Sequence, residues 1–90
     1  MSNLLRLIIQ SPVAKVWEGD IKALSAENSE GVFDILPDHA RFMSLVQASP
    51  LTLELPNAEI KSYTFENALL YVDENIATIY IQRPLQEISL

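Results

Sequence analysis

The chain has 90 residues, 49% of them hydrophobic and 20% charged, and a formal net charge of −6. This length suits one folded domain, and the composition is that of a globular protein. Its six basic residues are scattered along an acidic chain, which argues against a nucleic-acid partner and against direct binding to anionic lipid. The absence of cysteine excludes disulfides, thiolate catalysis and Cys-ligated zinc.

No segment is long and apolar enough to enter a membrane. The longest run without a charged residue extends from Phe42 to Leu53, well short of the ~20 residues that span a bilayer. The first apolar run contains Arg6 and lacks the long apolar region of a signal peptide. We therefore expect no direct membrane insertion.

Short strand-like segments separated by turn residues follow one another through the first half of the chain. Strands are predicted at Leu4 to Gln10, Lys15 to Glu18, Ile21 to Ala26 and Val32 to Leu36. The glycine in Glu18-Gly19-Asp20 is interpreted as a break between two of them. The stretch from Asp38 to Val46 is expected to form a helical turn at most, because its apolar stripe is short.

The second half continues the strand pattern. Leu51, Leu53 and Leu55 alternate with polar residues, which predicts a strand with one buried face. A further strand is predicted from Ile60 to Phe65. The segments Ala68 to Val72 and Ile76 to Ile81 are rich in aliphatic, β-branched and aromatic residues, and the polar connection between them predicts a β-hairpin.

Turn signals recurring roughly every eight to twelve residues predict an all-β fold. The expected architecture is an antiparallel β-sandwich or flattened barrel of about eight to ten short strands, forming a single domain over residues 1–90. Pro84 cannot donate to a strand ladder and should end the last strand. Residues 83–90 are therefore expected to be a tail, the stub of a missing or truncated C-terminal element.

The sole histidine, His39, follows a Leu-Pro turn and has acidic neighbours in Asp34 and Asp38. These three residues are the candidates for a small metal-binding or enzymatic site. Such a site would need further ligands, or a nucleophile within reach of the imidazole. The other interpretation is structural, with the imidazole bonded to a local carbonyl that holds the turn.

Two motifs carry a resemblance to a known family. Ser11-Pro12 and Trp17-Glu18-Gly19 lie close to the pattern Thr-Pro-x-x-x-x-(Tyr/Trp/Phe)-x-Gly. Asn28 to Phe42 matches Gly-Ser-Glu-Gly-x-(Phe/Leu)-Gly-Ile-(Leu/Tyr)-Pro-Gly-His-Ala-Pro-Leu. From about Leu5 to Ile81 the chain resembles the N-terminal domain of the epsilon subunit of F-type ATP synthases.

Four departures from this pattern stand out. Asp34 and Asp38 replace glycines, Arg41 replaces a proline, and Asn67-Ala68 stands where a Gly-Gly pair is usual. Asn and Asp tolerate left-handed backbone better than most residues. We therefore expect the turns at Asp38 and Asn67 to be kept.

The resemblance implies a mechanical role. It implies a non-catalytic rotor subunit of the central stalk that binds the gamma subunit and the polar loops of the c-ring. Such a subunit helps couple ion translocation to ATP synthesis or hydrolysis, peripheral to the membrane on its cytoplasmic side. No cofactor is implied. The family's C-terminal helical hairpin is not in this sequence, so neither regulatory braking nor ATP binding by this chain is expected.

The partner-binding residues that the resemblance implies are Ser11, Glu30, His39, Phe42 and Met43. Glu30 would contact the c-ring loops, and His39 would lie between gamma and the c-ring. Ser11 would lie near gamma, and an exposed Phe42-Met43 pair would anchor it. The structural alternatives are a solvated turn carboxylate, a turn hydroxyl and core packing. A generic adaptor sandwich that binds a peptide at a sheet edge is a further alternative.

Overall fold

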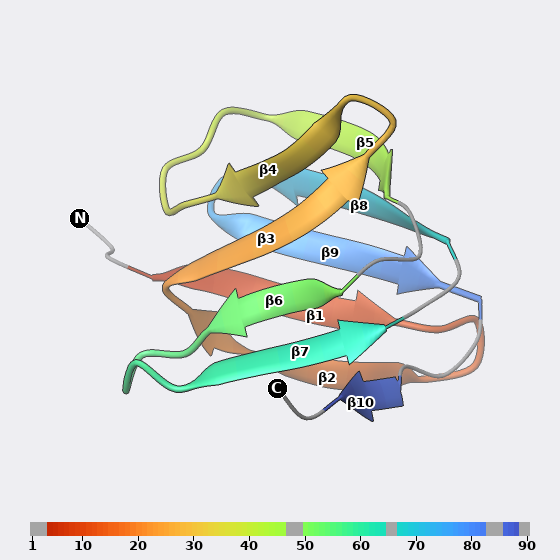
Figure 1. Ribbon diagram of the computed structural model, residues 1–90, viewed down its shortest axis with the longest axis horizontal. Helices are drawn as coiled ribbons and strands as arrows, with labels where there is room; N and C mark the ends of the chain where they lie inside the picture. The colour runs from red at the N-terminus through yellow and green to blue at the C-terminus, as the bar shows by residue number, and fades with distance from the viewer. Residues whose placement is uncertain (1–3, 47–49, 65–66, 83–85, 89–90) are drawn as a thin grey trace.

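The computed structural model describes residues 4–46, 50–64 and 67–82, together with the backbone of 86–88. These residues form ten strands in two five-stranded sheets that face each other (Figure 1). The predicted all-β sandwich is confirmed. The described residues form no helix, and so none that is long and apolar enough to cross a membrane.

The first sheet places Leu5–Gln10 beside Ile76–Ile81, two segments that are far apart in the sequence. Its strand order is β2 (Lys15–Ile21), β1 (Leu5–Gln10), β9 (Ile76–Ile81), β8 (Ala68–Asp73) and β5 (Phe42–Val46). β1 and β9 pair in parallel, whereas the other neighbours in this sheet are antiparallel. The predicted β8–β9 hairpin is present, with Glu74 and Asn75 as its turn.

The second sheet is antiparallel throughout. Its strand order is β10 (Gln86–Ile88), β7 (Ile60–Thr64), β6 (Leu51–Glu54), β3 (Ala23–Asn28) and β4 (Gly31–Ile35). β10 comes from the predicted tail, and it pairs with the edge of β7. A three-residue strand is too short to leave a periodic pattern, so its formation depends on the neighbouring strand.

The core lies between the sheets and follows the two-residue period of the strands. In β8, Ala68, Leu70 and Val72 point inward and are buried, while the residues between them are half-exposed. Both sheets contribute fully buried aliphatic side chains, namely Leu5, Leu7, Ile9, Ile21, Leu24, Ile35, Leu51, Leu53, Leu70 and Ile79.

The expected helical turn between Asp38 and Val46 is wrong, because Phe42–Val46 forms strand β5. This strand pairs with β8 from Phe42 opposite Val72 to Val46 opposite Ala68. Its outward residues Met43 and Leu45 are as apolar as its inward ones, so the sequence shows no polar alternation there.

Gly19 does not break the chain as predicted, since β2 continues through it to Ile21. The ring of Trp17 lies across this glycine, and a Cβ built on Gly19 would stand 2.7 Å from Trp17 Cη2. Trp17 also packs against the core. The glycine therefore makes room for an indole ring within one continuous strand.

We expect Gly19→Ala to destabilise the domain by about 1–2 kcal/mol, because the added methyl group displaces the Trp17 ring. Urea unfolding followed by circular dichroism measures the stability of every variant, and the fluorescence of Trp17, the sole tryptophan, reports the ring environment where the ring is present. In a Trp17→Leu background the same substitution should cost much less. Equal costs in the two backgrounds would show that the ring is not the obstacle.

An ion network covers the outer surface of β1 and β2. Arg6 bonds Glu18 at 2.9 Å and Asp20 at 3.2 Å, and Lys15 also pairs with Glu18. The hydrogen bond from Lys15, followed by that from Arg6, lowers the pKa of Glu18 below its ordinary value of 4.5. The hydrogen bonds from Arg6 to Glu18, and then to Asp20, raise the pKa of Arg6.

The lowered pKa of Glu18 gives this network a defined pH dependence. Its stabilisation should be present above the ordinary pKa of the carboxyl group and should be lost as the pH falls through the lowered value. The difference in thermal midpoint between the wild type and Glu18→Gln should therefore be largest near neutral pH and vanish in acid. Glu74→Gln serves as the control at an exposed turn. A wild-type to Glu18→Gln difference that stays constant with pH would contradict this account.

Candidate partner-binding surface

The outer surface of β5, β8 and β9, together with Ile8 on β1, is largely apolar. We call this surface the apolar face and define it by Ile8, Met43, Leu45, Leu69, Tyr71 and Tyr80. The side chains of Met43, Leu45 and Tyr80 are 62%, 73% and 47% exposed. Large aliphatic and aromatic side chains with this exposure on adjoining strands are unusual for a surface that stays in water.

The strand register makes these residues neighbours. One row across the sheet runs from Leu45 to Leu69 and then to Tyr80. A second row runs from Met43 through Tyr71 and Thr78 to Ile8. Residues directly opposite each other on adjacent strands have Cβ atoms about 5 Å apart, so the two rows form one continuous surface.

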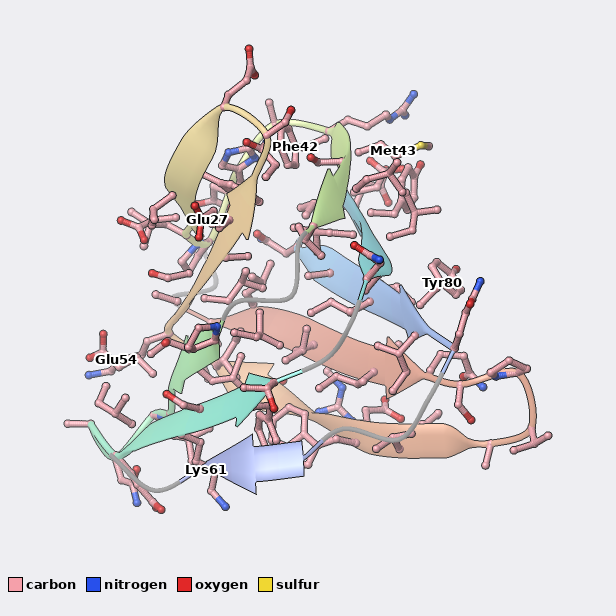
Figure 2. All side chains as sticks on the ribbon, turned by 45° about the vertical axis from the view of Figure 1, so that its right-hand side comes forward. Glu27, Phe42, Met43, Glu54, Lys61 and Tyr80 are labelled. Carbon is pink, nitrogen blue, oxygen red and sulfur yellow. The ribbon has the colours of Figure 1, made fainter. Side chains whose placement is uncertain are left out.

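The outer surface of the other sheet is more polar, although it exposes Val32 at 74% and Ile60 at 52%. Hydroxyl-bearing side chains lie across its strands, with Ser25 donating to Asp34 and with Thr52 Oγ1 lying 3.4 Å from Ser62 Oγ. Figure 2 shows Met43 and Tyr80 projecting from one side of the sandwich and Glu27 and Glu54 lying on the other. The two faces of the domain are therefore unequal.

A hollow of about 480 Å³ adjoins the apolar face at the β1–β2 turn. Its lining includes Ser11, Pro12, Leu45, Leu69 and Tyr80. Ser11 itself holds the turn, because its hydroxyl donates to the carbonyl of Ala14 at 2.9 Å and accepts the amide of that residue. The first predicted contact residue thus lies at the rim of the apolar face.

His39 lies in the loop of residues 36–41 between β4 and β5. Its amide donates to the carbonyl of Leu36 at 3.2 Å, and its Nδ1 lies 2.8 Å from the carbonyl oxygen of Ala40. The imidazole meets Phe42 edge-on, with ring centroids 5.6 Å apart, and Phe42 in turn meets Phe33 at 5.4 Å. This is the geometry of an imidazole that holds its own turn.

The sandwich matches a known protein family. Residues 4–85 match the family described as ATP synthase, Delta/Epsilon chain, beta-sandwich domain. The chain belongs to this family. The resemblance inferred from the Ser-Glu-Gly and Pro-x-His segments is therefore confirmed.

Curated relatives and solved structures agree with this assignment. The chain is 32% identical over 80 residues to an ATP synthase epsilon chain of Nitratiruptor and 33% identical over 81 residues to one of Ureaplasma urealyticum. Each match covers 89% of this chain, which spans 62% and 60% of the lengths of those relatives.

Among solved structures, a chain in the Euglena gracilis mitochondrial ATP synthase has a TM-score of 0.89 at 12% identity. That match covers 97% of this chain and 55% of the other. A chain in the Tetrahymena thermophila mitochondrial ATP synthase central stalk and c-ring has a TM-score of 0.74 at 15% identity, covering 90% of this chain and 64% of the other. At these identities the likeness shows a shared fold.

In this delta/epsilon sandwich, the residues predicted to bind partners do not form one cluster. Glu30 lies in the β3–β4 turn and His39 follows β4, so they are at opposite ends of that strand (Figure 1). The side chain of Asn28 accepts the Glu30 amide at 2.8 Å and donates to Ser44 Oγ on β5 at 3.1 Å, which orders the Glu30 turn.

The predicted exposed Phe42-Met43 pair is divided by the strand geometry. Met43 belongs to the apolar face, whereas Phe42 is half-buried and packs against the core. Adjacent residues of a strand point to opposite faces, so the two cannot share one exposed surface. Their roles in partner binding, like those of Ser11, Glu30 and His39, stay predictions.

The candidate metal or enzymatic site is not assembled. Asp34 accepts from Ser25, Asp38 accepts from Asn75, and the His39 ring contacts the Ala40 carbonyl. Within residues 4–46, 50–64 and 67–82, no group of three or more His, Asp or Glu side chains is placed to hold a metal ion. The three polar groups therefore serve separate local contacts.

Proposed function

We propose that this chain acts as an epsilon-type subunit in the central stalk of an F-type ATP synthase. It binds gamma through the apolar face and approaches the polar loops of the c-ring through the turns that carry Glu30 and His39. In this role it is a non-catalytic part of the rotor that helps couple ion translocation to ATP synthesis or hydrolysis. It is peripheral to the membrane, on the cytoplasmic side.

The observation that carries this proposal is the apolar face itself. Three large apolar side chains remain exposed in the isolated domain although their strands belong to a packed sheet. They are Met43 and Leu45 on the edge strand β5 and Tyr80 on the central strand β9. Aromatic residues and methionine are enriched in the cores of protein interfaces. Covering such a face with a partner removes a large apolar area from water and so favours association.

The surroundings of the apolar face also fit a protein interface. The ion network of Arg6, Glu18 and Asp20 borders the apolar face along β1 and β2. Asp73 adds a charged residue to this border at the end of β8. A polar border around an apolar centre is the usual anatomy of an interface between proteins. A net charge of −6 disfavours an anionic lipid as the alternative occupant.

Family membership supports the choice of partner. The curated relatives compared above are epsilon chains of ATP synthases, and the two solved structures compared above come from ATP synthase assemblies that include the c-ring. A partner from the rotor therefore has more support than a peptide added at a sheet edge.

The test is co-purification with the cognate gamma subunit, followed by addition of the detergent-solubilised c-ring. We expect a one-to-one complex with gamma at micromolar concentration, and retention of the c-ring by that complex. If folded gamma and this chain elute separately at that concentration, the proposed function is wrong.

A further inference from the structure

Contacts from the β8–β9 turn and from the end of β8 hold the loop of residues 36–41 on both sides of His39. Before the histidine, the Asn75 side chain donates from Nδ2 to Asp38 Oδ1 at 2.9 Å and accepts the Asp38 amide at its Oδ1. After it, Arg41 Nε lies 3.4 Å from Asp73 Oδ1. Both contacts join segments that are far apart in the sequence.

Asn75 is also fixed to the body of the sandwich. Its carbonyl oxygen accepts the backbone amide of Arg6 at 2.9 Å, which ties the turn to strand β1. Through its backbone and its amide side chain, this one residue therefore links β1, the β8–β9 turn and the His39 loop. These bonds therefore fix the position of the loop relative to strand β1 of the first sheet.

The backbone at these positions explains why such bonds are needed. Asp38, Glu74 and Asn75 all have left-handed backbone, with φ of 67°, 50° and 62°. That conformation is unfavourable for residues other than glycine, although Asp and Asn tolerate it best. The paired bonds between the Asn75 amide and Asp38 hold the loop residue in this conformation.

The Arg41–Asp73 ion pair is the weaker of the two contacts. The Arg41 side chain is 73% exposed, and exposed ion pairs contribute little because water competes for both charges. The Asn75 amide, by contrast, makes two bonds to a single residue in a fixed geometry. The loop position should therefore depend on Asn75 more than on Asp73.

We propose that Asn75 is the positioning residue of the His39 loop. Its paired bonds to Asp38 hold residues 36–41 in the shape that the rotor partner meets, an inference that rests on the proposed function. Asp38 and Arg41 stand where the family pattern has a glycine and a proline. In this chain, side-chain bonds from the β8–β9 turn thus take over part of the control that those residues exert on the backbone.

The test compares Asn75→Gly with Glu74→Gly. Both variants place glycine at a left-handed position of the same two-residue turn, so both relieve backbone strain. Only the first removes the bonds to Asp38. In the isolated chain, Asn75→Gly should speed hydrogen exchange of the Asp38 amide about tenfold or more, and Glu74→Gly should leave it at the wild-type rate.

The second measurement is affinity for the complex of gamma and the c-ring. Asn75→Gly should bind several-fold more weakly than Glu74→Gly, with both variants showing the circular dichroism of the folded domain. Unchanged exchange at Asp38 in Asn75→Gly, or equal affinity of the two variants under conditions in which the wild type binds, would overturn the proposal. Failure of the wild type to bind would overturn the proposed function alone, since exchange is measured without a partner.

Discussion

Leu45→Glu is expected to abolish tight binding of this domain to gamma while the domain stays folded. Leu45 is 73% exposed on the edge strand β5 of the apolar face, so the substitution costs little in the free protein. In the complex, the new carboxylate would be buried without a partner. An unpaired charge in an interface costs about 2–5 kcal/mol, which corresponds to a loss in affinity of about 30-fold or more.

Val32→Glu is the matched control for this substitution. Val32 is 74% exposed and also lies on an edge strand, but it belongs to the other sheet. Both variants carry the same added charge at a similarly exposed position of an edge strand. Titration calorimetry with purified gamma should show weakened binding for Leu45→Glu only. Equal losses in both variants, or none in either, would contradict the assignment of the apolar face.

Leu70→Ala should have the largest effect on folding. Leu70 is fully buried in β8, between β5 and β9, and replacing such a leucine with alanine leaves a cavity that costs about 2–5 kcal/mol. In a domain of this size each kcal/mol lowers the thermal midpoint by about 4–8 °C. Urea unfolding monitored by Trp17 fluorescence measures the loss.

The neighbouring residue Leu69 supplies the control for Leu70→Ala. It has the same side chain on the same strand but faces outward as part of the apolar face. Leu69→Ala should cost about 1 kcal/mol or less in stability and should instead weaken the complex with gamma. A Leu69→Ala variant as unstable as Leu70→Ala would show that the two faces of β8 have been assigned incorrectly.

Local patterns in the sequence were sufficient to predict most of the strands. In β8 and β9, aliphatic, β-branched and aromatic residues around a short polar turn predicted both strands and their pairing. β5 was missed because Met43 and Leu45 are apolar on the side that faces away from the core. Gly19 was misinterpreted because its role depends on the Trp17 ring, which sequence patterns do not place.

The candidate surface is only partly predictable from the sequence, for the same physical reason as β5. The family resemblance identifies Met43, whereas Leu45 falls in the stretch that is expected to be a helical turn at most. Leu69 and Tyr80 fall within predicted strands with no sign of an exposed surface. Their common face depends on the register among β5, β8 and β9, strands that are not all consecutive in the chain. The sequence alone does not distinguish an apolar residue at an outward position from one in the core.

The loop around His39 was predicted in part. Left-handed backbone was expected at Asp38 and Asn67, and Asp38 has it, whereas Asn67 is not among the described residues with positive φ. A local contact between the imidazole and a carbonyl was the structural alternative, and the structure contains one. The bonds from Asn75 could not be foreseen, because they join residues separated by 37 positions.

Hydroxyl-radical labelling of Met43 and Tyr80, in the free domain and in its complex with gamma, tests the central claim most directly. Both side chains are reactive and exposed in the free domain, at 62% and 47%. If the apolar face is the partner surface, labelling of both should fall several-fold when the complex forms. A stable complex in which both residues are labelled as fast as in the free domain would contradict this account.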